Sequence, residues 1–174
     1  AEVVLLERWP SVGGMATSGL MSNFSGSPQS PFVREILDAM EQHAPGCAVD
    51  GCQTNINRAI RHEALKSVLL QKLAEAGVGL RLYTFACGAI MEGRRIAGIV
   101  CESKSGRGAI LGRVVVDCTG DADIAARAGA AFQFGREEDG VCQPVTLMFR
   151  IGGVDYTRAV FPPSFESAIE LPKG

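Results

Sequence analysis

The sequence predicts an α/β fold in which a doubly wound parallel sheet carries an inserted three-stranded antiparallel meander. Three observations predict it. The aliphatic run Val3-Val4-Leu5-Leu6 is too short for a helix and is typical of a buried parallel strand. A segment with helical periodicity follows at 62–76. Three strand-like runs within residues 86–112 are then separated by turn residues.

Two amphipathic helices are expected before the meander. Ser30-Pro31 is typical of an N-cap followed by proline in the first turn, and the helix that it begins is expected to end near Pro45-Gly46. The second helix covers 62–76, and Gly77 is the C′ residue that ends it. The apolar face of the first helix is formed by Val33, Ile36, Leu37 and Met40. The remaining segments, 20–32 and 45–57, have loop composition.

Strands dominate after Gly77. A strand is expected at 78–84, and the meander uses strands at 86–91, 96–103 and 108–112. Val114-Val115-Val116 is expected to form a further buried parallel strand, followed by a short helix at 124–131. A last strand is expected from Val145 to Ile151, before the proline-containing tail 162–174. A helix that connects parallel strands is typical of a doubly wound sheet.

Composition excludes several classes of protein. The 174 residues carry a net charge of −2 and have a pI near 5.7, so we expect no nucleic-acid partner and no anionic membrane surface as partner. No apolar run is long enough for a membrane span, and no basic segment with a cleavage site marks a signal peptide. We therefore expect a cytoplasmic protein. Nothing in the sequence indicates its oligomeric state.

The six cysteines contain no C-x-x-C pair. This spacing supports neither a thioredoxin-like motif nor a paired zinc knuckle. Three of them lie in apolar, strand-like runs, where cysteine acts as a small hydrophobic residue: Cys87, Cys101 and Cys118. We therefore expect reduced thiols in all six.

Glu7 ends the first predicted strand. In a dinucleotide-binding βαβ unit, an acidic residue at this place accepts hydrogen bonds from a ribose and repels a 2′-phosphate. The glycine fingerprint of such a unit lies about 20 residues before the acidic residue, whereas six residues precede Glu7 here. We therefore expect a chain without the first strand and its phosphate-binding turn, and a sheet that is incomplete. The alternative is a surface glutamate that ends a strand.

A glycine-containing segment follows directly. Gly13-Gly14 allows backbone N–H groups to approach an anionic ligand, and ligands bind outside the carboxyl ends of strands in doubly wound sheets. Thr17 and Ser18 add hydroxyl groups that can reach a phosphate or the edge of a flavin. Neither lies next to a base, so no nucleophile is proposed. A flexible loop is the alternative, because such compositions are common in loops.

The segment Asp117 to Asp123 follows the valine run and opens the helix at 124–131. Its central residues Thr119-Gly120-Asp121 therefore present backbone N–H groups to whatever lies there. Three aspartates also suggest a metal loop, but the further ligands and terminal glutamate of a calcium loop are missing, so no metal is expected. One of the aspartates is alternatively a cap of the short helix.

The two histidines, His43 and His62, are expected to be solvated surface residues. General acid–base duty is the alternative. Arg58 and Arg61 lie beside His62 and either contact an anionic substrate or form a charged helix entry. No catalytic residue is assigned.

Three sets of motifs together resemble the FAD-dependent oxidoreductase family of the glutathione-reductase-like flavoproteins. They are Glu7-Arg8 with residues 13–19, Glu92-Gly93 with residues 96–99, and residues 116–123 with Ala128-Gly129. The resemblance runs from Val3 to about Gly153. It implies an FAD/NAD(P)-binding Rossmann-like sheet with FAD along its carboxyl edge. It also implies an oxidoreductase whose flavin accepts a hydride or electrons from a small-molecule substrate.

The resemblance also implies the residues that contact FAD. Glu7 would hold the adenosine ribose, residues 13–17 would follow the pyrophosphate toward the flavin, and Ala86 would offer backbone contacts to adenine. Residues 119–121 would close over the pyrophosphate. The implied set is Glu7, Arg8, Gly13, Gly14, Met15, Ala16, Thr17, Ala86, Thr119, Gly120 and Asp121.

Residues 1–143 are accordingly expected to form the FAD-binding domain, with the meander insert at about 86–112, and residues 144–174 to begin a second, substrate domain. The family's glycine fingerprint and C-terminal part are not in this sequence, so we expect an internal fragment that is inactive by itself. Two alternatives stay open. One is a nucleotide-binding or structural module without turnover. The other is a flavoprotein that modifies nucleic acid, against which the lack of a basic patch argues.

Overall fold

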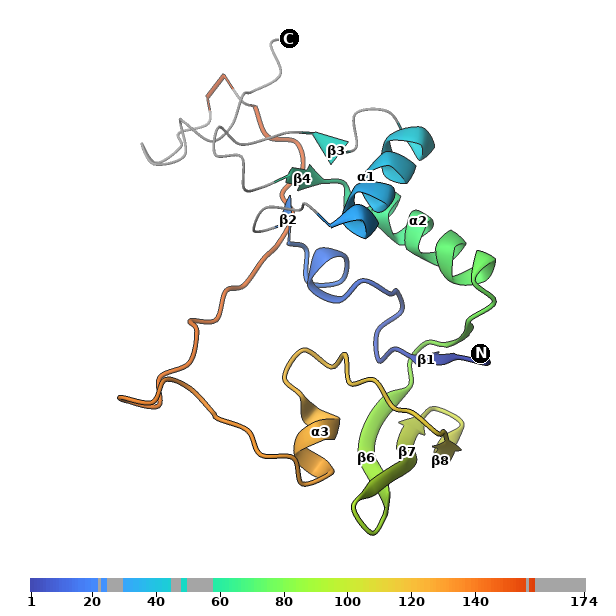
Figure 1. The fold of residues 1–174 in the computed structure, drawn as a ribbon. Coiled ribbons are helices and arrows are strands. Elements are labelled where there is room, and N and C mark those ends of the chain that lie inside the picture. Colours follow the sequence, from blue (N-terminus) through green and yellow to red (C-terminus); the bar gives the residue numbers. More distant parts are fainter. Residues whose placement is uncertain (22, 25–29, 45–47, 50–57, 156, 159–174) are drawn as a thin grey trace. The chain divides into compact units, whose positions relative to one another are not determined.

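A computed structural model describes residues 1–21, 23–24, 30–44, 48–49, 58–155 and 157–158 (Figure 1). The chain divides into two compact units. The first unit contains residues 1–10 and 78–146, and the second contains residues 11–77 and 147–174. Each is described by itself.

The first unit begins with a short parallel pair of strands. Strand β1 (Val4–Leu6) pairs with β5 (Gly79–Arg81), and Leu5 lies opposite Leu80. The strand expected at 3–6 is thus confirmed. The strand expected at 78–84 is shorter, because the chain turns at Tyr83, whose φ is 50°. The pair joins segments far apart in sequence, as a crossover connection between parallel strands requires.

The antiparallel meander follows as expected. Its strands are β6 (Phe85–Glu92), β7 (Arg95–Ser103) and β8 (Gly106–Leu111), in the order β6-β7-β8. Ala97, Ile99 and Cys101 on the central strand are buried, as the two-residue period of a half-buried strand predicts. The short helix α3 (Asp123–Arg127) lies against β6. It is shorter than the helix expected at 124–131.

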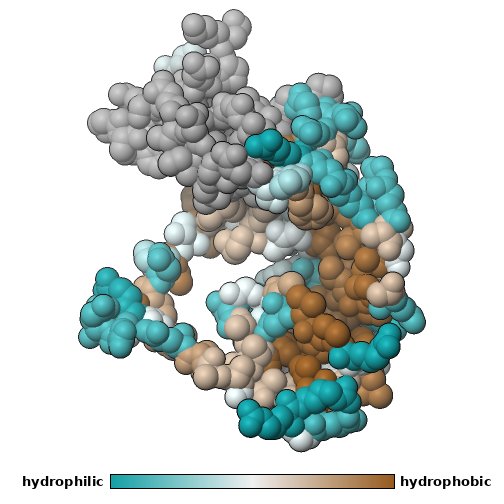
Figure 2. Space-filling view, viewed as in Figure 1, coloured by the Kyte–Doolittle hydropathy of each residue, from teal (hydrophilic) through white to brown (hydrophobic). Residues whose placement is uncertain are grey.

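Two expected strands are wrong. Val114–Val116 forms no strand, and Val114 and Val116 are 79% and 77% exposed. Figure 2 shows that hydrophobic residues are exposed on the face in view. The segment from Val145 to Ile151 forms none either, and Val145 is fully exposed. An aliphatic run favours a strand only where a neighbouring strand pairs with its backbone, and the described residues supply no such neighbour. Cys118, expected in such a run, is exposed as well.

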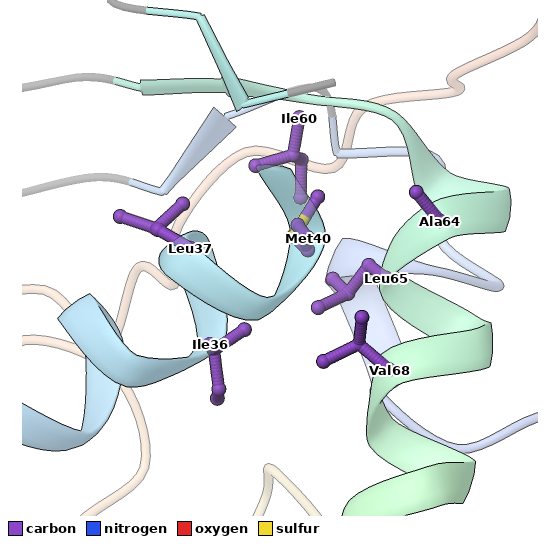
Figure 3. Close-up of a cluster of buried hydrophobic side chains, with 7 residues drawn as sticks. All are labelled: Ile36, Leu37, Met40, Ile60, Ala64, Leu65 and Val68. Carbon is purple, nitrogen blue, oxygen red and sulfur yellow. The ribbon is translucent and has the colours of Figure 1, made fainter. Parts of the chain in front are cut away.

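The second unit is built on two helices, α1 (Pro31–His43) and α2 (His62–Glu75). Both confirm the predictions: Ser30 precedes α1 with proline in its first turn, and Gly77 follows α2 with a φ of +65°. Their apolar faces meet in one core (Figure 3), which contains Ile36, Leu37, Met40, Ile60, Ala64, Leu65 and Val68. Val33 packs against this core.

A small antiparallel sheet was not expected. Two of its strands lie in the segments 20–32 and 45–57, which were expected to be loops, and another begins at residue 58. Its strands are β2 (Asn23–Phe24), β4 (Arg58–Ile60) and β3 (Ala48–Val49), in that order. Strands of two or three residues are too short to show a period in the sequence, so composition alone indicated loops. Helix α1 ends at His43, two residues before Pro45-Gly46, near which its end was expected. The tail 162–174 lies outside the described residues.

Within the described residues, no helix is both long and apolar enough to cross a membrane.

Candidate functional site

Glu7 is the residue that directly follows β1. Its backbone N–H donates to the carbonyl of Arg81 at 2.9 Å, and its carbonyl accepts from the N–H of Thr84 at 3.0 Å, so the segment after β5 holds it on both sides. The side chain is half-buried, and its Oε1 accepts from the N–H of Trp9 at 2.9 Å. This bond orients the carboxylate and leaves Oε2 with no hydrogen bond to any described residue.

Arg8 and Trp9 extend this end of β1. Both are exposed, and the guanidinium carbon of Arg8 lies 5.1 Å from the centroid of the Trp9 ring. Ala86, at the start of β6 in the same unit, is half-buried and pairs with Cys101 of β7. Thr84, the residue before β6, is buried and donates its hydroxyl to the carbonyl of Leu82.

The second unit contains the glycine segment. Gly13 has a φ of +104° and Gly14 a φ of +52°, and Gly14–Ala16 forms a single 3-10 turn, η1. A side chain on Gly13 would force its neighbours to move, because a Cβ there would lie 2.7 Å from Cγ2 of Thr17 and 2.9 Å from Cδ1 of Leu69. A Cβ on Gly14 would meet nothing within 4 Å. The loop therefore packs closely against α2 at Gly13 and is open at Gly14.

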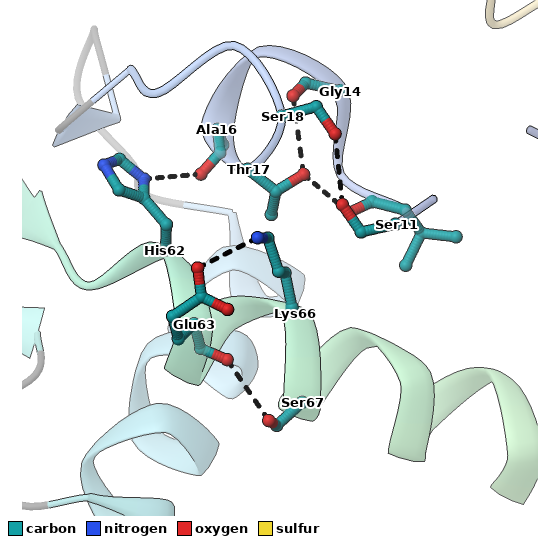
Figure 4. Close-up of polar contacts among 10 residues, drawn as sticks. Ser11, Gly14, Ala16, Thr17, Ser18, His62, Glu63, Lys66 and Ser67 are labelled. Carbon is teal, nitrogen blue, oxygen red and sulfur yellow. Dashed lines mark hydrogen bonds and ion pairs between the residues drawn. The ribbon is translucent and has the colours of Figure 1, made fainter. Parts of the chain in front are cut away.

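Thr17 closes this loop from inside (Figure 4). Its side chain is fully buried and donates to the carbonyl of Val12 at 2.6 Å, while its backbone N–H donates to the carbonyl of Gly14 at 3.2 Å. The hydroxyls of Ser11 and Ser18 lie 3.1 Å apart and join the two ends of the segment. The hydroxyl of Thr17 therefore donates its proton within the loop and does not donate it to a ligand.

The backbone N–H groups of Gly13, Gly14 and Met15 donate to no described residue. Three successive free donors, with no side chain at two of the three positions, suit an oxyanion such as a phosphate. A set of donors with no acceptor among them favours an anionic ligand over a cation. The arrangement does not need the proton of Thr17.

His62 corrects one prediction. It was expected on the surface, but it is only 8% exposed, and its Nδ1 lies 3.1 Å from the carbonyl oxygen of Ala16. His62 is the first residue of α2 and shares a helix face with Leu65 and Leu69, three and seven residues later. This spacing in the sequence indicates that His62 lies on the apolar, buried face of the helix. His43 is exposed, as expected.

The segment after the valine run is organised by Asp117. Its Oδ1 accepts from the backbone N–H and hydroxyl of Thr119, and its Oδ2 accepts from the N–H groups of Ile124 and Ala125 at 2.9 and 2.8 Å. Burial alone would raise the pKa of Asp117, but these hydrogen bonds outweigh it and lower the pKa below its ordinary value. Asp117 thus caps α3, as one of the alternatives for this segment predicted.

Thr119, Gly120 and Asp121 lie exposed beside this cap, and Gly120 has a φ of +93°. The hydroxyl of Thr119 also accepts from the N–H of Asp123. No group of three or more His, Cys, Asp or Glu side chains that would hold a metal ion occurs among the described residues. The cysteines described by the structure, Cys87, Cys101, Cys118 and Cys142, are free thiols. Cys47 and Cys52 lie outside the described residues.

The site residues from the sequence thus fall into two groups. The first unit contains Glu7, Arg8, Ala86, Thr119, Gly120 and Asp121, and the second contains Gly13, Gly14, Met15, Ala16 and Thr17. Two further residues support them that the sequence analysis did not place there: Trp9, whose N–H donates to Glu7, and His62, which was expected in solvent.

Comparison with known proteins identifies one matching family and two solved structures with a similar fold. The profile of the family described as FAD dependent oxidoreductase matches residues 1–170. The structure of Thermovibrio ammonificans THI4 is similar, with a TM-score of 0.53 and 17% identity, over 81% of this chain and 54% of that one. CabE, an aromatic hydroxylase from angucycline biosynthesis, is similar with a TM-score of 0.51 and 18% identity, over 74% of this chain and 28% of that one.

These likenesses concern the fold. This chain spans about half the length of the first structure and less than a third of the second. No curated protein matches the sequence.

Proposed function

We propose, because this chain belongs to the FAD-dependent oxidoreductase family, that it supplies the FAD-binding part of an enzyme that oxidises or reduces a small-molecule substrate. FAD is the cofactor of this family, and the chain has the Rossmann-type fold of its members. The redox chemistry of such an enzyme is supplied by its bound flavin, while the protein supplies binding and orientation.

The observation that carries the proposal is the loop at Gly13 to Thr17. Its three free N–H donors, from Gly13, Gly14 and Met15, suit the pyrophosphate of FAD. Its inner side is closed by buried hydrogen bonds of Thr17, so the donors need no rearrangement to bind an anion. A preorganised donor set binds more tightly than a flexible one, because less conformational freedom is lost on binding. Met15 and Ala16 continue the loop toward the flavin in this proposal.

Glu7 is the proposed ligand of the adenosine ribose. Its Oε1 is held by the N–H of Trp9, and Oε2 is available to a ribose hydroxyl. A carboxylate in this position favours FAD over a 2′-phosphorylated nucleotide, because two negative charges repel. Arg8 would lie beside the same end of the cofactor, and the backbone of Ala86 would face adenine.

Thr119, Gly120 and Asp121 are proposed to close over the pyrophosphate. The Asp117 cap supports this assignment, because it holds the exposed segment in one conformation at the start of α3. In the same proposal, residues 1–143 are the FAD-binding domain and residues 144–174 begin the substrate domain.

The test is the visible absorbance of the complete protein after purification and reconstitution with FAD. We expect a flavin band that remains after gel filtration, and bleaching of that band when a suitable small-molecule substrate is added without oxygen. A protein that retains no flavin would contradict the proposed cofactor. A retained flavin that no small molecule reduces, but that chemical reductants do reduce, would favour a binding module without turnover.

A further inference from the structure

We propose that His62 is a positioning residue for the cofactor loop: its Nδ1–H holds the carbonyl of Ala16, and so keeps the Gly13–Met15 donors directed at the pyrophosphate. This inference rests on the proposed function, since it assigns a role within the same FAD site. The chemistry of the pair carries it. A carbonyl oxygen only accepts, so the proton of the 3.1 Å contact belongs to Nδ1 of His62.

The peptide bond between Ala16 and Thr17 is thereby held on both of its polar sides. Its carbonyl accepts from His62, and its N–H donates to the carbonyl of Gly14 at 3.2 Å. A peptide plane held at both ends cannot flip without breaking two hydrogen bonds. The N–H groups of Gly13, Gly14 and Met15 have no described acceptor, and they belong to the turn that ends at this held plane.

His62 also places the loop on a rigid element. It is the first residue of α2, and Cδ1 of Leu69, two turns later on the same face, lies 2.9 Å from where a Cβ of Gly13 would be. Ala16 and Leu69 both pack against the core that α1 and α2 share. The loop therefore contacts α2 at two points, a hydrogen bond at Ala16 and a close packing contact at Gly13.

The tautomer has a further consequence. With the neutral ring protonated at Nδ1, Nε2 has a lone pair and no proton. No fully buried side-chain nitrogen or oxygen of the described residues lacks a partner, so Nε2 reaches the surface. Replacement of the ring by an amide therefore needs to reproduce only the Nδ1 donor.

Asparagine and glutamine separate this role from a general packing role. In His62→Asn the amide nitrogen takes the place of Nδ1, whereas in His62→Gln it reaches the place of Nε2. We expect His62→Asn to bind FAD nearly as tightly as the wild type. His62→Gln should bind it about three- to tenfold more weakly, as expected for the loss of one hydrogen bond. The measurement is the dissociation constant of FAD by flavin fluorescence in the complete protein, with the melting temperature of each apoprotein as the control for folding.

The outcomes are distinct. Equal affinity of the Gln variant and the wild type, or equal loss in both variants, would overturn the inference and leave the proposed function intact. A wild-type protein that binds no FAD would overturn the proposed function itself.

A second measurement, the ¹⁵N chemical shifts of the His62 ring, tests the proton position in the wild-type protein without any variant. A proton on Nδ1 supports the proposal, and a neutral ring with its proton on Nε2 contradicts it.

Discussion

The hydroxyl oxygen of Thr17 lies 2.6 Å from the carbonyl oxygen of Val12, in a side chain with no solvent exposure. This bond spans the two glycines of the loop at residues 12–17 and joins the ends of that loop. Val12 is itself only 4% exposed, so loss of the hydroxyl would leave its carbonyl without a partner in a buried residue.

The first prediction concerns this bond. Thr17→Val keeps the shape of the side chain but leaves the Val12 carbonyl unsatisfied, which we expect to lower the free energy of unfolding by about 1–3 kcal/mol. Thr17→Ser keeps the hydroxyl and loses one methyl group, which we expect to cost about 0.8 kcal/mol. Denaturant unfolding of both variants measures the difference. A valine variant as stable as the serine variant would show that the hydrogen bond contributes nothing.

Gly13→Ala and Gly14→Ala form a matched pair, because both glycines have a positive φ but only Gly13 is crowded. At Gly14 we expect only the cost of the left-handed conformation, about 1–2 kcal/mol. At Gly13 the new Cβ would also collide with Cγ2 of Thr17, a buried group that its own hydrogen bond holds in place. Gly13→Ala should therefore lose clearly more stability, and FAD affinity with it. Thermal unfolding and flavin fluorescence measure both quantities, and equal losses at the two sites would contradict the packing seen here.

The Asp117 cap predicts a pH dependence. Hydrogen bonds to the carboxylate lower the pKa of Asp117 in the folded state. The cap therefore stabilises α3 fully above the ordinary pKa of an aspartate, and this stabilisation is lost as the pH falls through the lowered pKa. Amide hydrogen exchange at Ile124 and Ala125, measured against pH, should show protection that disappears in acid.

Asp117→Asn tests the same cap at neutral pH. An amide replaces one of the two acceptor oxygens with a donor, so the loss should resemble that of an N-cap, about 0.5–2 kcal/mol. Asp121→Asn is the control, since Asp121 is exposed and caps nothing in the described residues. We expect exchange at Ile124 to accelerate in the first variant only, and its protection relative to the intrinsic exchange rate to become independent of pH there. Equal acceleration in both variants would argue against a specific cap.

Glu7→Ala tests the proposed ribose contact. Loss of a hydrogen bond to a charged group corresponds to about 1.5–3 kcal/mol, or about ten- to a hundredfold in the dissociation constant of FAD. Glu2→Ala removes an exposed carboxylate before the same strand and serves as the control. Flavin fluorescence titration of the complete protein measures both. An unchanged constant in Glu7→Ala would remove Glu7 from the site.

Several elements of this fold are predictable because their evidence is local. The periodic apolar positions of α1 and α2, the proline after Ser30 and the glycine after Ala76 set the bounds of both helices within a residue or two. The meander is equally local, since its strands are neighbours in sequence and are joined by glycine-containing turns. The end of β1 at Glu7 was predictable for the same reason.

The errors concern residues whose structure depends on distant partners. Val114–Val116 has the composition of a buried strand, but a strand needs a neighbour to pair with, which composition does not reveal. The small sheet of β2, β3 and β4 was missed for the converse reason: its strands exist only through pairing over long separations. His62 was expected in solvent because its burial depends on a loop 46 residues earlier in the sequence.

By itself, the sequence determined the helices, the meander, the acidic end of β1 and the family, because these depend on short-range periodicity and on motifs. Tertiary structure alone decided which donors of the loop at residues 12–17 are free. The hydroxyl of Thr17 donates to the carbonyl of Val12, and the ring of His62 contacts the carbonyl of Ala16. The N–H groups of Gly13, Gly14 and Met15 have no described acceptor. A hydrogen bond depends on distance and direction in space, and these are set only when the loop packs against α2.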